Sequence, residues 1–287
     1  MKNNQILKTS AFILLSIICI PQVMLAHQPR ITESRKTIVT DPEISKAYYS
    51  KLTGEPDVYI IESNKTFNLY VNVLVPDAPD QKQDVSAVVL KDGNQIVLLD
   101  GMNFTWQKFY EPFGADNYLA GPEYEAAVDP GTYEVRVWSS NNDSKYSLAI
   151  GKIEAFDGKE GINALTVIPK LKQDFFGSWP ISFIKSPFGW GLIVAMYILS
   201  GVLLLALKLI NKFLIKKMSP AQNNPPHNIG CKDRIIRLVL GIGLLALAIN
   251  TTWNPVIIFL SGFCIFESLF SWCGFYSLIG RNTCPTE

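Results

Sequence analysis

One nearly uncharged segment limits what this chain can fold into. Residues 190–210 read WGLIVAMYILSGVLLLALKLI, in which Lys208 is the single charged side chain. A helix of about 20 apolar residues spans the hydrocarbon core of a bilayer. The whole chain has 287 residues, of which 48% are hydrophobic, so it also has room for a soluble domain. We therefore expect a transmembrane helix over residues 189–211 and a soluble domain elsewhere.

Basic residues around this segment predict its orientation. Lys212, Lys216 and Lys217 follow the apolar run. Lysine and arginine are enriched on the cytoplasmic side of transmembrane helices. We expect residues 27–188 to be extracytoplasmic and residues 212–229 to form a cytoplasmic linker.

The N-terminus resembles a secretory signal peptide. Lys2 and Lys8 precede the apolar run AFILLSIICI, and Ala26 is a small residue at a suitable cleavage position. We expect residues 1–26 to be removed, so that the mature chain begins at His27. Met24 is large for its position, three residues before the cut, which leaves an uncleaved anchor as the alternative.

The segment over residues 27–152 has the alternation of β-strands. In TFNLYVNVLVPD, the apolar residues from Phe67 to Val75 fall on one face and polar residues on the other. Turn residues separate such runs at Asp92–Gly93–Asn94 and Asp129–Pro130–Gly131. Seven to nine short strands predict an all-β extracytoplasmic domain, an antiparallel β-sandwich of jelly-roll or immunoglobulin-like type.

The run AVDPGTYEVRVWSSNNDSKYSLAIG, at the end of this domain, resembles the closing strands of prepeptidase C-terminal-type β-sandwich domains. In that family a turn of small residues and a Gly-Thr-Tyr precede an alternating valine strand. The resemblance implies an accessory or binding module and names no ligand.

The charge and the residue content of the part expected to be exported argue against several functions. Residues 27–188 hold 16 basic and 22 acidic side chains, which disfavours nucleic-acid binding. No cysteine lies between His27 and Gly230, and the chain has two histidines, His27 and His227, so a serine triad or histidine zinc site is not expected. We expect no cofactor and no catalytic residues. The carboxylates that could act in pairs are Glu123, Glu125, Asp100, Glu111, Asp116 and Asp129, which we interpret as solvated loop and strand residues.

Three further segments complete the chain. Residues 153–188 are rich in Phe and Trp and predict an amphipathic neck next to the membrane. Residues 230–287 contain two apolar runs of sixteen residues joined by TTWN, with Lys232, Arg234 and Arg237 before the first and Arg281 after the second. A tight transmembrane hairpin with a cytoplasmic tail fits this pattern, giving three transmembrane helices in total.

Ten residues in and beside the hairpin form a recognisable pattern: Asn228, Gly230, Asp233, Arg234, Arg237, Cys273, Tyr276, Gly280, Thr283 and Cys284. In this pattern the hairpin resembles a known family, the YgaP-like transmembrane domain. The chain departs from the family pattern at Gly274, where proline is usual, and at Cys231 and Glu267. The resemblance implies an inner-membrane hairpin of unknown function. We find no rhodanese domain in the sequence, so the resemblance does not imply sulfur transfer.

Two sets of residues in the hairpin are candidate sites. Cys231, Cys273 and Cys284 should all lie near the cytoplasmic surface, where basic neighbours favour thiolate, although simple packing roles explain them as well. Glu267 lies inside the last apolar run, and we expect Arg234 or Arg237 to pair with it.

The function expected from these observations is that of a multi-pass protein of the cytoplasmic (inner) membrane, with a sandwich that binds a partner and has no enzymatic activity. Its expected partners are the lipid bilayer, an envelope protein or surface polymer, and a second copy through the transmembrane hairpin. The alternative is a thiol relay or redox sensor on the cytoplasmic face that uses the C-terminal cysteines.

Overall fold

The computed structural model describes residues 27–218 and 227–284. The expected signal segment therefore lies outside the described residues, as do residues 219–226 of the expected cytoplasmic linker. The chain divides into two compact units, one ending at Ser186 and the other beginning at Pro187. Each unit is described by itself.

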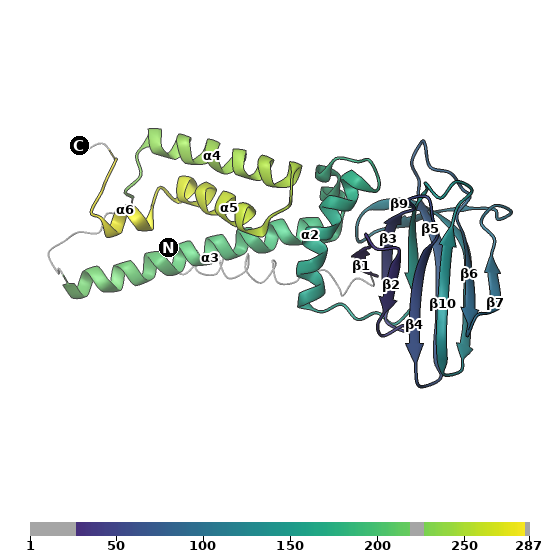
Figure 1. Ribbon diagram of the computed structural model, residues 1–287. Coiled ribbons are helices and arrows are strands. Elements are labelled where there is room, and N and C mark those ends of the chain that lie inside the picture. The colour runs from purple at the N-terminus through teal and green to yellow at the C-terminus, as the bar shows by residue number, and fades with distance from the viewer. Residues whose placement is uncertain (1–26, 219–226, 285–287) are drawn as a thin grey trace. The chain divides into compact units, whose positions relative to one another are not determined.

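The first unit contains two β-sheets (Figure 1). The six-stranded sheet has the order β1-β3-β11-β5-β9-β8, formed in that order by Gln28–Ile31, Lys46–Lys51, Lys145–Ile150, Phe67–Pro76, Asp116–Val128 and Gln107–Glu111. The five-stranded sheet has the order β2-β4-β10-β6-β7, formed by Lys36–Val39, Asp57–Ser63, Gly131–Trp138, Ser86–Lys91 and Asn94–Leu99.

Alternate residues of both sheets fill the space between them. From the six-stranded sheet, Phe67, Leu69, Val71, Val73 and Val75 are all at most 3% exposed. The five-stranded sheet adds residues that include Tyr59, Ile61, Val89, Tyr133 and Val135 to the same core. The two-sheet β domain predicted from the period-two pattern is thus confirmed, because burial of one face per strand produces that pattern.

The predicted hairpin turn joins β6 to β7. Asp92 and Gly93 both have positive φ, 50° and 83°. A two-residue turn with two positive φ angles matches the twist of an antiparallel hairpin, and aspartate and glycine adopt it readily.

The strand count and two strand directions differ from the sequence expectation. Eleven strands are present in the described part of the first unit. β1 pairs with β3 in parallel, and β2 pairs with β4 in parallel, whereas the other ladders are antiparallel. The chain crosses from one sheet to the other after each of its first four strands, and alternation in a sequence does not encode direction.

The expected neck contains a helix that packs on the sandwich. Helix α2 (Gly158–Asp174) is capped at its N-terminus by Asp157, whose side chain accepts from the backbone nitrogen of Glu160 at 2.8 Å. Leu171 and Phe175 pack with residues on the outer face of the six-stranded sheet. A 3₁₀ helix, η1 (Pro180–Lys185), completes the unit. The segment 153–186 is therefore part of the β domain.

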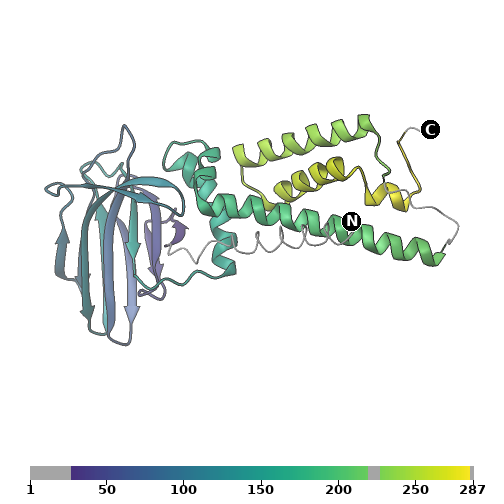
Figure 2. The same cartoon turned by 180° about the vertical axis from the view of Figure 1, so that it is seen from behind.

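The second unit consists of helices. They are α3 (Pro187–Met218), α4 (Cys231–Asn250), α5 (Pro255–Phe270) and the short α6 (Gly274–Leu278). Helix α5 packs against both α3 and α4, as seen from both sides in Figures 1 and 2. Among the described residues, Pro187–Phe213 is the one span long and apolar enough to cross a membrane by itself, and Pro255–Phe270 is a shorter apolar helix.

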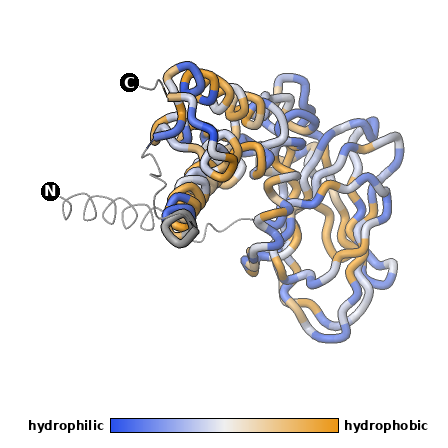
Figure 3. The backbone as a smooth tube through the Cα atoms, turned by 90° about the vertical axis from the view of Figure 1, so that its left-hand side faces the viewer, coloured by the Kyte–Doolittle hydropathy of each residue, from blue (hydrophilic) through white to orange (hydrophobic). Residues whose placement is uncertain are grey.

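The two units differ in how apolar residues are distributed. Along the strands, hydrophobic and hydrophilic residues alternate, whereas the C-terminal helices carry long hydrophobic stretches (Figure 3). Many of these apolar helical side chains are exposed, among them Val202, Leu209, Ile236, Val239 and Leu269. An apolar exterior of this kind fits lipid rather than water.

Candidate functional site

A buried charged cluster lies between α2 and the six-stranded sheet. The Lys172 side chain is fully buried, and its ammonium donates to the Asp116 carboxylate at 2.6 Å. It also donates to the backbone oxygens of Gly114 and Ala115 at 2.5 and 3.1 Å. Burial lowers the pKa of Lys172 and raises the pKa of Asp116, because both charged forms lose water. The cluster therefore fixes α2 to the loop before β9.

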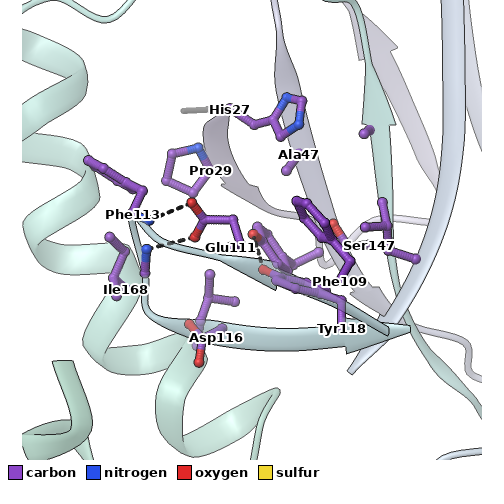
Figure 4. A pocket seen from close by; sticks show the side chains of 15 residues that line it. His27, Pro29, Ala47, Phe109, Glu111, Phe113, Asp116, Tyr118, Ser147 and Ile168 are labelled. Atoms are coloured by element: carbon purple, nitrogen blue, oxygen red, sulfur yellow. Dashed lines mark hydrogen bonds between the residues drawn. The ribbon is translucent and has the colours of Figure 1, made fainter. Parts of the chain in front are cut away.

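Glu111 lies in the same region, and its carboxylate is also engaged in hydrogen bonds. Its two oxygens accept from the backbone nitrogens of Phe113 and Gly114, both at 2.6 Å (Figure 4). Burial raises the pKa of this carboxyl, and the two backbone donors oppose that shift. The carboxylate closes the tight β8–β9 turn.

A small cavity opens beside these residues. It has a volume of about 30 Å³ and is lined by residues that include His27, Tyr49, Glu111 and Tyr118 (Figure 4). The hydroxyls of Tyr49 and Tyr118 are 2.8 Å apart, and burial raises the pKa of both phenols. The His27 ring contacts the Ser45 hydroxyl. A space of this size holds one or two water molecules and is too small for a substrate.

The other carboxylates singled out from the sequence lie in solvated positions or in turns. Glu123 and Glu125 project from β9 on the outer face of the six-stranded sheet, where they accept from the Tyr70 hydroxyl and the Asn68 amide. Asp100 accepts from the backbone nitrogens of Met102 and Asn103. Asp129 lies in the exposed turn before β10. The structure does not bring these four carboxylates together.

Two open depressions flank Phe175 at the end of α2. Their volumes are about 410 and 420 Å³, and Lys51 and Lys145 line both. The Lys145 ammonium already donates to the backbone oxygens of Asp174 and Phe175 at 2.6 and 3.2 Å. This lysine therefore holds the C-terminal end of α2.

The outer face of the five-stranded sheet is rich in aliphatic side chains. We call it the aliphatic face and define it by Ile38, Val58, Ile60, Val88, Leu90, Ile96 and Leu98. Their strand neighbours, such as Tyr59 and Val89, point into the core, so these residues point outward. At its centre, Arg136 and Glu134 of β10 form an ion pair of 2.6 Å. Sequence reasoning missed this face, although the aliphatic residues between core positions were a signal.

In the second unit, the motif residues of the hairpin form one hydrogen-bonded network, which we call the clasp. The Asn228 amide donates to the Cys273 carbonyl at 2.9 Å and accepts from the Cys273 nitrogen at 2.7 Å. Asp233 accepts from the hydroxyls of Tyr276 and Thr283 at 3.1 and 2.8 Å. These bonds tie the start of α4 to the segment after α5.

Gly230 is required by a close approach within the clasp. Its backbone nitrogen donates to the Thr283 hydroxyl at 2.9 Å. A Cβ atom at this position would overlap the backbone carbonyl of Thr283 and stand 3.4 Å from the Cys284 nitrogen. The segment 228–231 therefore lies against residues 283–284.

The candidate ion pair is formed by one of the two expected arginines. Arg237 pairs with Glu267, which is 4% exposed. Arg234 instead donates from Nε to the Ser268 carbonyl at 2.9 Å. The Arg237 and Arg281 guanidinium groups lie 5.0 and 4.8 Å from the Tyr276 ring. The charge of Glu267 is thus compensated within the hairpin.

The three candidate thiols occupy different environments. Cys231 is exposed, Cys284 is half-buried and Cys273 is 3% exposed. Burial raises the pKa of Cys273, which opposes thiolate formation. The clasp brings the chain segments of Cys231 and Cys284 together and leaves Cys273 in the packed interior of the hairpin.

The contacts that serine and tyrosine hydroxyls make between helices were not predicted. The Ser261 hydroxyl donates to the Gly241 carbonyl of α4 at 2.8 Å and lies 3.0 Å from the Tyr197 hydroxyl of α3. Ser200 of α3 donates to the Phe259 carbonyl at 2.8 Å. Small and hydroxylated residues at such contacts are typical of helix packing in membranes.

No metal centre is evident in the described ranges. Within residues 27–218 and 227–284, no three His, Cys, Asp or Glu side chains are grouped so that they could hold a metal ion.

The solved structures that match this chain have low similarity to it. A pre-peptidase C-terminal domain of a Bacillus anthracis collagenase shares 14% identity, covers 44% of this chain and 95% of its own, and has a TM-score of 0.25. A surface-associated copper-binding protein of Methylomicrobium album BG8 shares 8% identity, covers 43% of this chain and 98% of its own, and has a TM-score of 0.22. These similarities transfer no function. No curated protein was found to match the chain.

The C-terminal hairpin has a specific match. The model of one family, described as inner membrane protein YgaP-like, transmembrane domain, matches residues 226–287. This range contains the whole clasp and the ion pair between Arg237 and Glu267. The resemblance predicted from the motif is thus confirmed: residues 226–287 of this chain match the YgaP-like transmembrane domain family.

Proposed function

We propose that this chain is a multi-pass inner-membrane protein that holds an extracytoplasmic β-sandwich as a protein-binding module and acts by binding, without catalysis. The aliphatic face carries the binding proposal. Ile38 and Leu98 on this face are 71% and 48% exposed. Contiguous apolar surface on a soluble domain marks interaction sites. The carboxylates closest to a cavity, Glu111 and Asp116, are engaged in holding a turn and α2.

Three membrane spans are the second part of the proposal. Helices α3, α4 and α5 expose aliphatic side chains outward, while Ser200, Ser261 and Glu267 are buried among the helices. The 20 residues of α4 give about 30 Å of helix, which is enough to span. The 16 residues of α5 are short and require local thinning of the bilayer. The confirmed YgaP-like match supports placement in an inner membrane.

Thiol labelling tests this topology. A membrane-impermeant maleimide should label Cys231 in inverted vesicles and not in intact spheroplasts. A cysteine introduced at the exposed Ser140, in the β10–β11 turn, should show the opposite result. Labelling of Cys231 from outside would contradict the proposed orientation.

Photocrosslinking tests the binding role. A photoreactive amino acid at Leu98 should give protein adducts in cells, because Leu98 lies on the aliphatic face. The matched control is the same amino acid at Glu123, which is exposed on the other sheet. Equal adduct yields at the two positions would refute binding through this face.

A thiol relay is the second candidate function, and the close approach of Gly230, the residue before Cys231, to residues 283–284 favours it. Oxidation would join the two sulfurs of Cys231 and Cys284, with two electrons and two protons passing to a disulfide or quinone oxidant. Diamide, a thiol oxidant, should then produce an intramolecular disulfide in inverted vesicles that the Cys284→Ser variant cannot form. A wild-type protein that keeps both thiols free under diamide would exclude this relay.

A further inference from the structure

We infer that the aliphatic face is a self-complementary interface and that its partner is a second copy of this chain. The inference rests on the proposed binding function and names the partner. Sandwich sheets normally present polar residues to water on their outer face. Here seven aliphatic residues occupy such positions, and no helix of residues 158–186 packs on them, because α2 packs on the six-stranded sheet.

The register of the strands arranges this face in two rows. At the level of Glu134 lie Ile60 of β4 and Leu90 of β6. At the level of Arg136 lie Val58 and Val88. Figure 1 shows β4, β10 and β6 side by side. Each row therefore has one charged residue between two aliphatic residues.

A twofold axis between two copies of the chain would place each row of one copy over the other row of the second copy. Consider two copies whose aliphatic faces meet, with the twofold axis lying between the two faces. When this axis is perpendicular to the strands and passes at the level of Val135, β10 of one copy lies antiparallel over β10 of the other. Glu134 then faces Arg136 of the second copy, and Arg136 faces its Glu134. Ile60 faces Val58, and Leu90 faces Val88. These four appositions are apolar with apolar or acidic with basic, as an isologous interface requires, whereas at the edge of the sheet Ile38 faces Lys36 of the second copy.

The opposite sheet lacks this property. On its outer face, β9 carries Glu123 and Glu125 at equivalent spacing, with Tyr124 between them. The same twofold operation would place Glu123 against Glu125 of the second copy, and like charges in apposition repel. Self-complementarity is therefore specific to the aliphatic face.

The rim and the centre of the aliphatic face differ in their charged residues, as they do in known interfaces. Lys36 lies at the edge of the sheet, at the level of Val58. Charged residues are common at interface rims and depleted at fully buried centres unless they are paired. The one central charge pair is matched both within the chain and across the proposed axis, which avoids an unpaired buried charge.

A charge-swapped variant tests the inference without removing the pair inside the chain. In Glu134→Arg/Arg136→Glu, the two charges exchange places, so the variant should fold and should associate with itself like the wild type. Mixed with wild type, it should not associate, because each acidic side chain would then face an acidic one and each basic side chain a basic one. The measurement is co-purification of two differently tagged full-length chains, co-expressed and solubilised in mild detergent. We expect the mixed pair to fall at least about tenfold below either matched pair.

Variants with a single reversed charge test the same inference independently. Each of E134R and R136E should lose self-association by about tenfold, and the two expressed together should regain it. Both should keep the wild-type melting temperature, because exposed ion pairs contribute little to stability. The matched control is Lys108→Glu, which reverses an exposed lysine that lies 3.6 Å from Asp77 on the other sheet and should leave association unchanged.

Two results would overturn the inference. Association that is equal in all pairings would place the contact elsewhere, for example in the transmembrane hairpin. Loss in the single variants without recovery in the complementary pair would mean that a different protein binds the face. In that second case the Leu98 photoadduct would persist with another mass, and the proposed binding function would stand without the dimer.

Discussion

The Lys172 ammonium and the Asp116 carboxylate, 56 residues apart in the chain, lie 2.6 Å from each other in a buried pair. For both groups, burial shifts the pKa more than the attraction between the two charges does. The pKa of Lys172 is therefore lowered and that of Asp116 is raised. Such a pair adds little net stability, yet losing one partner leaves the other charge buried and unpaired.

The first prediction concerns this pair. Lys172→Met should destabilise the β domain by about 3–5 kcal/mol, because Asp116 and two backbone carbonyls lose their donor. Chemical denaturation followed by circular dichroism measures the change. The matched control is Lys170→Met, whose 54% exposed side chain should matter by less than about 0.5 kcal/mol. Equal effects of the two substitutions would refute a structural role for the buried pair.

The second prediction concerns the extent of the β domain. A fragment of residues 27–186 should fold as a cooperative, mainly β unit. A fragment of residues 27–152 lacks α2 and exposes the surface of Tyr49, Leu74 and Tyr118 that Leu171 and Phe175 cover. We expect it to melt at lower temperature and to bind a hydrophobic dye. Indistinguishable melting of the two fragments would show that α2 is dispensable.

The third prediction concerns the clasp. Gly230→Ala should lower the melting temperature of the full-length protein in detergent, because the new Cβ meets the Thr283 carbonyl. Gly243→Ala is the matched control, since nothing lies within 4 Å of its Cβ position. Alanine favours a helix over glycine by about 1 kcal/mol, so the control should be neutral or stabilising. A neutral Gly230→Ala would contradict the close packing of the clasp.

The fourth prediction concerns pH. Burial lowers the pKa of His27 from its ordinary value of 6.5, so the folded state favours the neutral ring. The unfolded state therefore takes up the proton first as pH falls, and stability declines through and below pH 6.5. The wild type should lose more stability than His27→Gln between about pH 7 and pH 5, as measured by thermal unfolding. The opposite ordering would mean that a charged His27 is preferred in the fold.

The sequence predicted the features that depend on local pattern. Alternation located the core side of Phe67 to Val75, and turn residues located the β6–β7 hairpin, because burial of one face and positive φ leave marks on neighbouring residues. The motif from Asn228 to Cys284 predicted the family match, but it did not reveal that Asp233 joins Tyr276 to Thr283.

Long-range pairing was decided only by the tertiary structure. Nothing near Lys172 in the chain indicates Asp116 as its partner, and nothing near Glu267 favours Arg237 over Arg234. The parallel pairing of β1 with β3 and the aliphatic face likewise depend on which strands become neighbours. A sequence pattern records which side of an element is buried, whereas the partner on that side depends on how distant elements pack together, and this packing brought Lys172 to Asp116.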